Sequence, residues 1–526
     1  MFKIIILTGI FFIKINFLFS QVTQEWEQRY YQDTNTMDGS KSLVLDRAGN
    51  IYVTGSAGGP TNDDIVTIKY TASGQQLWLR SYNGVGNSFD RGDKIKLDND
   101  NNIIVLGNRT FTGNGSDFVL IKYSTFGTEE WLTTIPCTGS NSFPSTFEID
   151  KFNNIYVLGR CNNNYALIKY FSTGKQHWVS QLEAPDSFDR PWDLKLDNSR
   201  NIYITGEKSS DCITIKYDSN GVMQWERIYG GIGNQQDFTN SLELDCSGNI
   251  YVSGSSVENP NHFGGYLTIK YNTEGVEEWV KIYEGSANFM DVAKAMKVDK
   301  SGNVYVTGYS TESGQGYNMT TMKYNSHGDT IWKRTFNNGS NDIATALTLD
   351  ESGNIYITGQ SDGVGGNGDD YATIKYDSSG NQKWVKRYNY QGPFGDYAQA
   401  IAVDNIGNVY VTGQSNRDFL TIKYSQPTEI VFNQSYTPNE YKLIQNYPNP
   451  FNPATHFEYE ITYMALVTIK VYDVLGSEVA TLVNENKIPG RYEVKFDGSK
   501  ISSGIYFYRL FVDGNIIDTK SMILVK

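Results

Sequence analysis

The chain has 526 residues, which is enough to bury at least one large hydrophobic core and to form more than one domain. Its formal net charge of -13 argues against proteins that bind nucleic acids or anionic membranes, because such partners repel an acidic surface. With 37 tyrosines, 26 phenylalanines and 50 glycines, the composition favours strands and turns. We therefore expect an all-β protein with no nucleic-acid partner.

The N-terminus has the pattern of a signal peptide. Lys3 supplies a positive charge, residues 4–19 are mostly apolar, and Ser20 marks a plausible cleavage point. A membrane anchor would need about 20 uninterrupted apolar residues, and Lys14 breaks the run. The sequence predicts a signal peptide over residues 1–20 and no transmembrane segment after its removal.

A seven-residue segment recurs along the chain. It first appears as Gly-Asn-Ile-Tyr-Val-Thr-Gly over residues 49–55, and its eight copies are spaced by 47 to 54 residues. This spacing is typical of one four-stranded blade per repeat. We predict a β-propeller of eight repeats over residues 21–426. The closing glycines of the eight copies are Gly55, Gly107, Gly159, Gly206, Gly254, Gly308, Gly359 and Gly413.

Each repeat contains four strand-like runs, which we name A to D in chain order. Strand A ends at an aspartate, strand B is the recurring segment, strand C ends at a tyrosine, and strand D carries a tryptophan. Only seven D strands follow a C strand, and the remaining tryptophan, Trp26, stands before the first A strand. A ring closed by this N-terminal strand leaves no open sheet edge. The sequence thus predicts eight blades, with a seven-bladed ring as the alternative.

These residues resemble the SBBP family of β-propeller repeats over about residues 22–425. The aspartate turn, the recurring B strand, the C strand that ends in Ile-Lys-Tyr and the tryptophan of strand D carry the resemblance. The resemblance implies the propeller fold but no defined activity, and the family name refers to seven blades where eight repeats are counted here.

After Tyr424 the repeat pattern stops. Residues 427–440 have the composition of a linker, with two prolines. Short runs with strand-like patterning follow, from His456 to Val525. This predicts a small C-terminal Ig-like β-sandwich over residues 441–526.

The C-terminal part resembles the type A sorting domain of the type IX secretion system. The matching segments are residues 447–455, 471–479, 490–496, 503–508 and 520–526. The resemblance implies export through the periplasm of a Gram-negative bacterium, recognition by the outer-membrane translocon, and a secreted or cell-surface location. An ordinary adhesive Ig-like module is the alternative. The candidate residues of the sorting signal are Pro448, Pro450, Gly504, Tyr506, Lys520 and Lys526.

The residues that usually carry catalysis or bind zinc are scarce. The four histidines are scattered, and the four cysteines form no Cys-x-x-Cys pair, so we expect neither a zinc site nor another cofactor. Export permits disulfide bonds, and the pairing stays open among Cys137, Cys161, Cys212 and Cys246.

An aspartate stands eight residues before the A-strand aspartate in seven of the eight repeats. These carboxylates suit either a calcium site or the capping of loop backbone, and their recurrence in nearly every repeat favours capping. The candidate calcium ligands are Asp90, Asp189, Asp237, Asp291, Asp342 and Asp396.

Two further patterns concern binding and the channel. The recurring tyrosines and tryptophans suit packing between blades, so aromatic residues that break the repeat are the better ligand candidates: Trp192, Phe263, Phe394 and Tyr397. Two residues before the A-strand aspartate, the charge alternates over five repeats, which predicts ion pairs around the channel between Lys96, Glu148, Lys195, Glu243 and Lys297.

These observations favour a non-catalytic binding or adhesion platform whose ligand is an unidentified surface glycan or protein. Two alternatives remain. One is a hydrolase or lyase that acts on extracellular polysaccharide, and the other is a structural component of a surface layer. A fold alone does not decide between them.

Overall fold

The computed structural model describes residues 22–32, 38–59, 62–85, 89–111, 115–137, 142–183, 189–231, 235–258, 263–363, 368–426, 440–463, 465–487 and 490–526. The predicted signal peptide, and the predicted linker apart from residue 440, lie outside these ranges. The described residues are all-β, and no helix among them is long and apolar enough to cross a membrane. The chain divides into two compact units, residues 1–428 and 429–526.

Within its described residues, the first unit contains eight four-stranded antiparallel sheets. Seven of them take their A, B, C and D strands consecutively from the chain, as predicted from the repeat. The strands of the first four sheets are β2 (Gly39–Leu45), β3 (Ile51–Gly59), β4 (Asn62–Tyr70) and β5 (Gln76–Tyr82); β6 (Asp90–Leu97), β7 (Ile103–Phe111), β8 (Gly115–Tyr123) and β9 (Glu129–Ile135); β10 (Phe143–Ile149), β11 (Ile155–Cys161), β12 (Asn164–Tyr170) and β13 (Gln176–Glu183); β14 (Arg190–Leu196), β15 (Ile202–Lys208), β16 (Asp211–Tyr217) and β17 (Met223–Tyr229).

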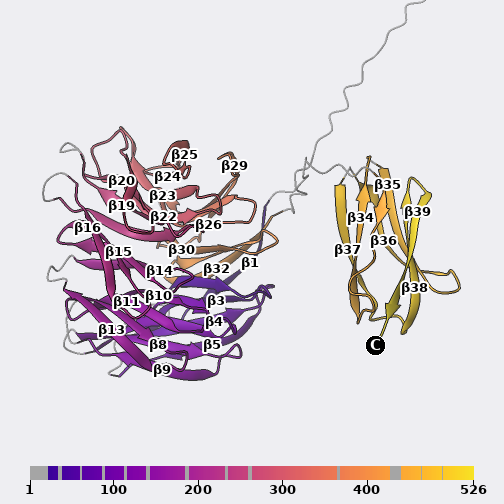
Figure 1. Ribbon diagram of the computed structural model, residues 1–526, viewed down its shortest axis with the longest axis horizontal. Helices are drawn as coiled ribbons and strands as arrows, with labels where there is room; N and C mark the ends of the chain where they lie inside the picture. Colours follow the sequence, from indigo (N-terminus) through magenta and orange to yellow (C-terminus); the bar gives the residue numbers. More distant parts are fainter. Residues whose placement is uncertain are drawn as a thin grey trace, which may run out of the picture. The chain divides into compact units, whose positions relative to one another are not determined.

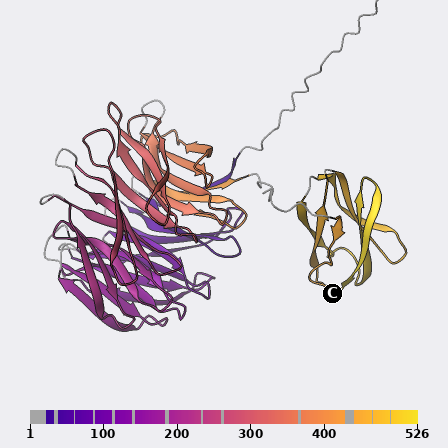
Figure 2. The same ribbon diagram turned by 45° about the horizontal axis from the view of Figure 1, so that its top comes forward.

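The next three sheets repeat this order. Their strands are β18 (Phe238–Leu244), β19 (Ile250–Ser256), β20 (Gly265–Tyr271) and β21 (Glu277–Tyr283); β22 (Val292–Val298), β23 (Val304–Thr311), β24 (Tyr317–Tyr324) and β25 (Thr330–Phe336); β26 (Ile343–Leu349), β27 (Ile355–Asp362), β28 (Asp369–Tyr376) and β29 (Gln382–Tyr388). Figure 1 shows the sheets following one another in sequence colour, and Figure 2 shows the same succession from a second direction.

The eighth sheet combines the two ends of the repeat region. It contains β30 (Asp396–Val403), β31 (Val409–Ser415) and β32 (Asp418–Ser425), and its fourth strand is the N-terminal β1 (Thr23–Tyr30). β1 lies beside β32 (Figure 1) and pairs with it antiparallel. In this pairing Trp26 is opposite Lys423. The strand around Trp26 thus occupies the D position that the sequence leaves empty after Tyr424.

One aspartate organises each turn between strands A and B. In the first sheet, Asp46 Oδ1 accepts hydrogen bonds from the N–H groups of Ala48 and Asn50, at 2.9 and 2.8 Å. Its Oδ2 accepts from the Asn50 amide at 2.7 Å and from the Tyr52 hydroxyl at 3.0 Å. The carboxylate therefore fixes both the turn and the buried tyrosine of strand B.

A tryptophan on each D position packs between two sheets. Trp78 lies between Tyr52 of its own sheet and Tyr123 of the next, with ring centroids 6.1 and 6.3 Å apart. Its indole N–H donates to the Thr125 carbonyl at 3.2 Å. Gly127 has φ 78°, and a Cβ there would lie 2.8 Å from the Trp78 ring, so the close approach requires glycine.

Trp26 makes the same contacts with the first sheet. Its ring centroid lies 6.2 Å from that of Tyr410 and 6.3 Å from that of Tyr70, and its indole N–H donates to the Ala72 carbonyl at 3.1 Å. A Cβ on Gly74 would lie 2.8 Å from the Trp26 ring. The eighth sheet therefore packs on the first as each sheet packs on the next.

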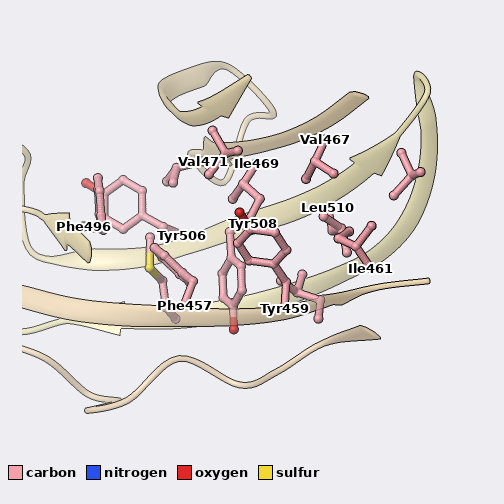
Figure 3. Close-up of a cluster of buried hydrophobic side chains, with 14 of the residues drawn as sticks. Phe457, Tyr459, Ile461, Val467, Ile469, Val471, Phe496, Tyr506, Tyr508 and Leu510 are labelled. Atoms are coloured by element: carbon pink, nitrogen blue, oxygen red, sulfur yellow. The ribbon is translucent and has the colours of Figure 1, made fainter. Parts of the chain in front are cut away.

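The second unit has two sheets of its own. One contains β33 (Lys442–Leu443), β34 (Ala454–Ile461) and β37 (Gly490–Asp497), and the other has the order β36 (Glu478–Lys487), β35 (Ala465–Tyr472), β38 (Gly504–Val512) and β39 (Asn515–Leu524). Alternate side chains of both sheets fill one core, with Phe457, Tyr459, Ile469, Tyr508 and Leu510 buried there (Figure 3). This core is separate from those of the first unit.

Candidate functional sites

Buried aspartates just before the A strands connect two loops. Asp237 is 1 % exposed, and its carboxylate accepts hydrogen bonds from the N–H groups of Gly231 at 2.5 Å and Val257 at 2.8 Å. Gly231 follows β17 and Val257 follows β19, so one carboxylate joins the loop that enters the sheet to the loop between strands B and C. Asp90 and Asp291 accept from the equivalent pairs of N–H groups.

The other three candidate calcium ligands are held in a similar way. Asp189, Asp342 and Asp396 each accept a hydrogen bond from loop backbone, the donors being Ser209, Asn338 and Tyr390. The six aspartates belong to six different sheets. Among the described residues, no group of three or more His, Cys, Asp or Glu side chains is placed to hold a metal ion. These contacts are those of loop capping, and a calcium role stays a prediction.

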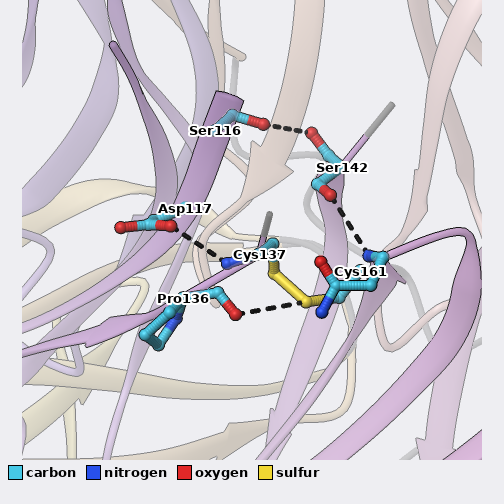
Figure 4. The surroundings of a disulfide bond; sticks show 7 residues. Ser116, Asp117, Pro136, Cys137, Ser142 and Cys161 are labelled. Atoms are coloured by element: carbon cyan, nitrogen blue, oxygen red, sulfur yellow. Dashed lines mark hydrogen bonds between the residues drawn. A yellow bond between two sulfur atoms is a disulfide. The ribbon is translucent and has the colours of Figure 1, made fainter. Parts of the chain in front are cut away.

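The third sheet carries a disulfide where the other sheets have this aspartate. Ser142 stands at the aspartate position, and its hydroxyl accepts a hydrogen bond from the Asn162 N–H at 3.3 Å. Cys137, in the loop after β9, is bonded to Cys161 at the end of β11 (Figure 4). The disulfide thus joins the same two regions that a carboxylate joins elsewhere. Of the other cysteines, one is buried and one is exposed, namely Cys212 and Cys246.

The four aromatic ligand candidates lie in three different sheets. Trp192 is on β14, and its indole Nε1 is buried without a hydrogen-bond partner among the described residues. Phe263 precedes β20 and is 64 % exposed. Phe394 precedes β30, and the Arg417 guanidinium carbon lies 3.5 Å from the centre of the Phe394 ring. Tyr397 is on β30 itself. The structure therefore brings only Phe394 and Tyr397 into one sheet.

Every A strand contains a β-bulge at the same place. In each A strand the register with the B strand shifts across the residue that stands five positions before the A-strand aspartate, which leaves that residue without a partner on the B strand. Bulges redirect side chains and are common beside functional sites. We call the eight extra residues the bulge ring: Lys41, Asp93, Ser145, Trp192, Asn240, Lys294, Thr345 and Gln399.

Further along the A strands, charged side chains pair between neighbouring strands. Lys96 Nζ lies 2.7 Å from Glu148 Oε1, and Lys195 Nζ lies 3.7 Å from the same oxygen. Lys297 pairs with Glu243 on the adjacent strand. These contacts confirm the predicted ion pairs for three of the four neighbouring pairs of charged residues.

Three lysines on the A strands were missed by sequence reasoning. Lys41, Lys94 and Lys294 are exposed to solvent, yet burial by the surrounding protein lowers the pKa of each ammonium group. Both findings fit a group that protein encloses on several sides while water still reaches it. For Lys41 and Lys294 the available signal was the position five residues before the A-strand aspartate, where the residue type changes from each repeat to the next, whereas Lys94 stands one position later.

The candidate sorting residues gather along the last strand of the second unit. Pro448 and Pro450 belong to a segment that lies beside β39, because the Phe451 N–H donates to the Ile523 carbonyl at 2.9 Å and the Val525 N–H donates to the Phe451 carbonyl at 3.0 Å. The remaining candidates lie on β38, on β39 or at the chain end, and they are Gly504, Tyr506, Lys520 and Lys526. The proline segment near residue 450 and the last strand, which are about 75 residues apart in the sequence, thus lie side by side.

Two family comparisons bear on these units. Residues 445–525 match the family described as Secretion system C-terminal sorting domain. The tail is a secretion sorting domain. Residues 331–366 and 383–419 match the family described as Beta-propeller repeat. Both predicted resemblances are confirmed, and the sorting domain indicates export through the type IX secretion system to the cell surface or the outside.

A search of curated proteins finds no match to this chain. Among solved structures, Sqt1 from Chaetomium thermophilum is 7 % identical with a TM-score of 0.49, covering 76 % of this chain and 99 % of its own. A fungal alcohol oxidase of the AA5 family, in complex with copper, is 11 % identical with a TM-score of 0.39, covering 96 % and 100 %. A protein of unknown function from Bacteroides caccae is 11 % identical with a TM-score of 0.33, covering 54 % and 93 %.

Proposed function

We propose that this chain is an exported β-propeller that binds a surface or extracellular ligand without catalysing a reaction. The sorting domain supports export, and we place the mature protein at the cell surface or in the medium of a Gram-negative bacterium. We further infer that the eight sheets are eight blades of one ring, and that the sorting domain is an Ig-like sandwich. The contacts of Trp26 support the ring, because they repeat those of Trp78 at an interior seam.

The bulge ring carries the binding proposal. Architectural positions, such as the A-strand aspartate and the B-strand glycine, keep one residue type in all eight repeats. The bulge position instead changes from repeat to repeat and presents polar or aromatic side chains. A position whose residue type varies between repeats, on rigid strands near the axis of the proposed propeller, suits recognition of a specific ligand.

A glycan and protein array probed with the mature full-length chain tests the proposal. We expect saturable binding of a ligand that is recovered chemically unchanged. Turnover of any member of a polysaccharide panel would replace the proposal with the hydrolase or lyase alternative. Self-assembly into sheets without ligand binding would favour a structural surface-layer component.

A further inference from the structure

The bulge-ring side chains lie on strands that pack side by side. The Ser145 hydroxyl on β10 donates to the Pro191 carbonyl on β14 at 2.5 Å. The charges of Asp193 and Lys195, both on β14, act on the Lys94 ammonium of β6, although β10 lies between these strands. A bulge turns its extra side chain out of the regular pleat. The ring and Lys94 therefore border one common space, the central channel of the proposed propeller.

This space has an excess of positive charge in an acidic protein. Apart from the capping aspartates, the A strands carry eight Lys or Arg and four acidic side chains, whereas the chain as a whole has a net charge of -13. The four acids are all held in ion pairs with Lys or Arg, and they are Asp93, Glu148, Asp193 and Glu243. No ion pair within the described residues engages Lys41, Lys94 or Lys294. The charge of Asp93 acts on Lys41 and Lys94, and that of Asp193 acts on Lys94, but both carboxylates are already paired with other cations. An anion would therefore add counter-charge to this space.

Hydrogen-bonding groups of the ring lack partners as well. Trp192 Nε1 is a buried donor, and Asp93 Oδ2 and Asn240 Oδ1 are buried acceptors, and none has a partner among the described residues. A buried polar group without a partner destabilises the folded state. A hydroxyl group both donates and accepts, so a polyhydroxylated ligand would satisfy all three atoms.

Resting on the proposed function, we propose that the bulge ring and Lys94 bind an acidic saccharide in the central channel. The ammonium groups of Lys41, Lys94 and Lys294, which stand on three different A strands, meet its anionic groups, which are carboxylates or sulfate esters. The indole N–H of Trp192 and the oxygens of Asp93 and Asn240 meet its hydroxyl groups. Charge and hydroxyl recognition together separate this ligand from inorganic anions and from neutral sugars.

Titration calorimetry on the mature full-length chain tests this ligand class. The probes are trigalacturonate, a sulfated trisaccharide, an uncharged trisaccharide and sodium sulfate. We expect at least one acidic trisaccharide to bind, and which of the two binds identifies the anionic group. Inorganic sulfate should bind at least tenfold more weakly. Equal binding of sulfate or of the uncharged sugar, or no binding of either acidic sugar, would overturn the proposal.

Matched variants locate the site. The triple variant Lys41→Gln, Lys94→Gln, Lys294→Gln should lose at least tenfold in affinity for the acidic sugar. Trp192→Phe, which keeps a ring but removes the N–H, should lose severalfold without any change of charge. A control with the same charge change outside the A strands should bind like the parent, and it consists of Lys175→Gln, Lys300→Gln and Lys386→Gln. All variants must first match the parent in melting temperature.

A wrong channel site and a wrong binding function would give different experimental results. If the array finds a ligand whose affinity is the same in the lysine variant, the proposed binding function stands and the channel site is wrong. If the array finds no ligand at all, the proposed function itself is contradicted.

Discussion

Glu207, on β15, is an acidic residue in a setting that disfavours its charge. It is 2 % exposed, and burial raises its pKa to about 7, although the Gln236 amide donates to Oε1 at 2.8 Å. A carboxyl whose pKa is raised in the folded state binds its proton more tightly there than in the unfolded chain. Its contribution is therefore fully favourable at low pH and is lost as the pH rises through the folded pKa.

We expect Glu207→Gln to raise the melting temperature, and to do so more at pH 7.5 than at pH 5. The amide imitates the protonated acid and retains the oxygen that accepts from Gln236, but it carries no charge to bury. Thermal unfolding across this pH range measures the difference. Glu351→Gln, at an exposed turn, is the control and should be neutral. A gain that is the same at both pH values would contradict the assignment.

Sequence reasoning reached some residues of these sites and not others. The loop-capping aspartates were recognisable because capping needs one residue type at one spacing, and seven of the eight repeats display both. The bulge was not recognisable, since a register shift between β-strands leaves no fixed residue type behind. Lys41 and Asn240 therefore looked like ordinary strand residues until the pairing of strands A and B placed them.

The Cys137–Cys161 disulfide depends on how strands from two sheets meet, and not on local sequence alone. Cys137 and Cys161 are 24 residues apart, and nothing local joins them. Their proximity depends on β10 folding back beside β11 and on the loop from the preceding sheet meeting its end. Sequence alone left the pairing open for this reason, whereas the eight-fold repeat was enough to predict the strands themselves.

Replacing both bonded cysteines by serine should destabilise the propeller. Closing a loop of this length restricts the unfolded chain by about 3 kcal/mol in the chain-entropy description. We expect Cys137→Ser, Cys161→Ser to lower the free energy of unfolding by about this amount, as measured by chemical denaturation. The exposed Cys246→Ser is the control. An unchanged free energy in the double variant would mean that the loop is held by other contacts.

Deleting residues 22–31 should remove the fourth strand of the eighth sheet. β32 would then present an open edge, and the contact of Trp26 with the Ala72 carbonyl would be lost. We expect a lower melting temperature and concentration-dependent aggregation, measured by calorimetry and light scattering. Gln24→Ala, on the same strand but exposed, should leave both unchanged. A truncated chain that melts like the parent would show that β1 does not close the ring.

At the scale of the whole molecule, the two units have separate cores and separate tasks. The buried aromatic cluster around Phe457 and Tyr508 belongs entirely to the second unit, so that unit can be recognised as a folded module. The sequence predicted this division from the loss of the repeat after Tyr424. It did not reveal that the proline segment around Phe451 pairs beside β39, because that contact joins distant parts of the tail.

Removing residues 441–526 should therefore block export without unfolding the propeller. The cores of the first unit contain no residue from the tail, so the truncated chain should keep the propeller's melting transition. In the native host it should accumulate in the periplasm, because the translocon has no sorting domain to recognise, and fractionation with immunoblotting measures this.

Conversely, residues 427–526 fused to an unrelated periplasmic protein should carry that protein to the surface or the medium. A fusion bearing Phe457→Asp, which disrupts the core of the sorting domain, is the control and should stay inside. Truncated chains that reach the outside at normal levels would mean that the tail is an ordinary adhesive module and that export depends on another part of the protein.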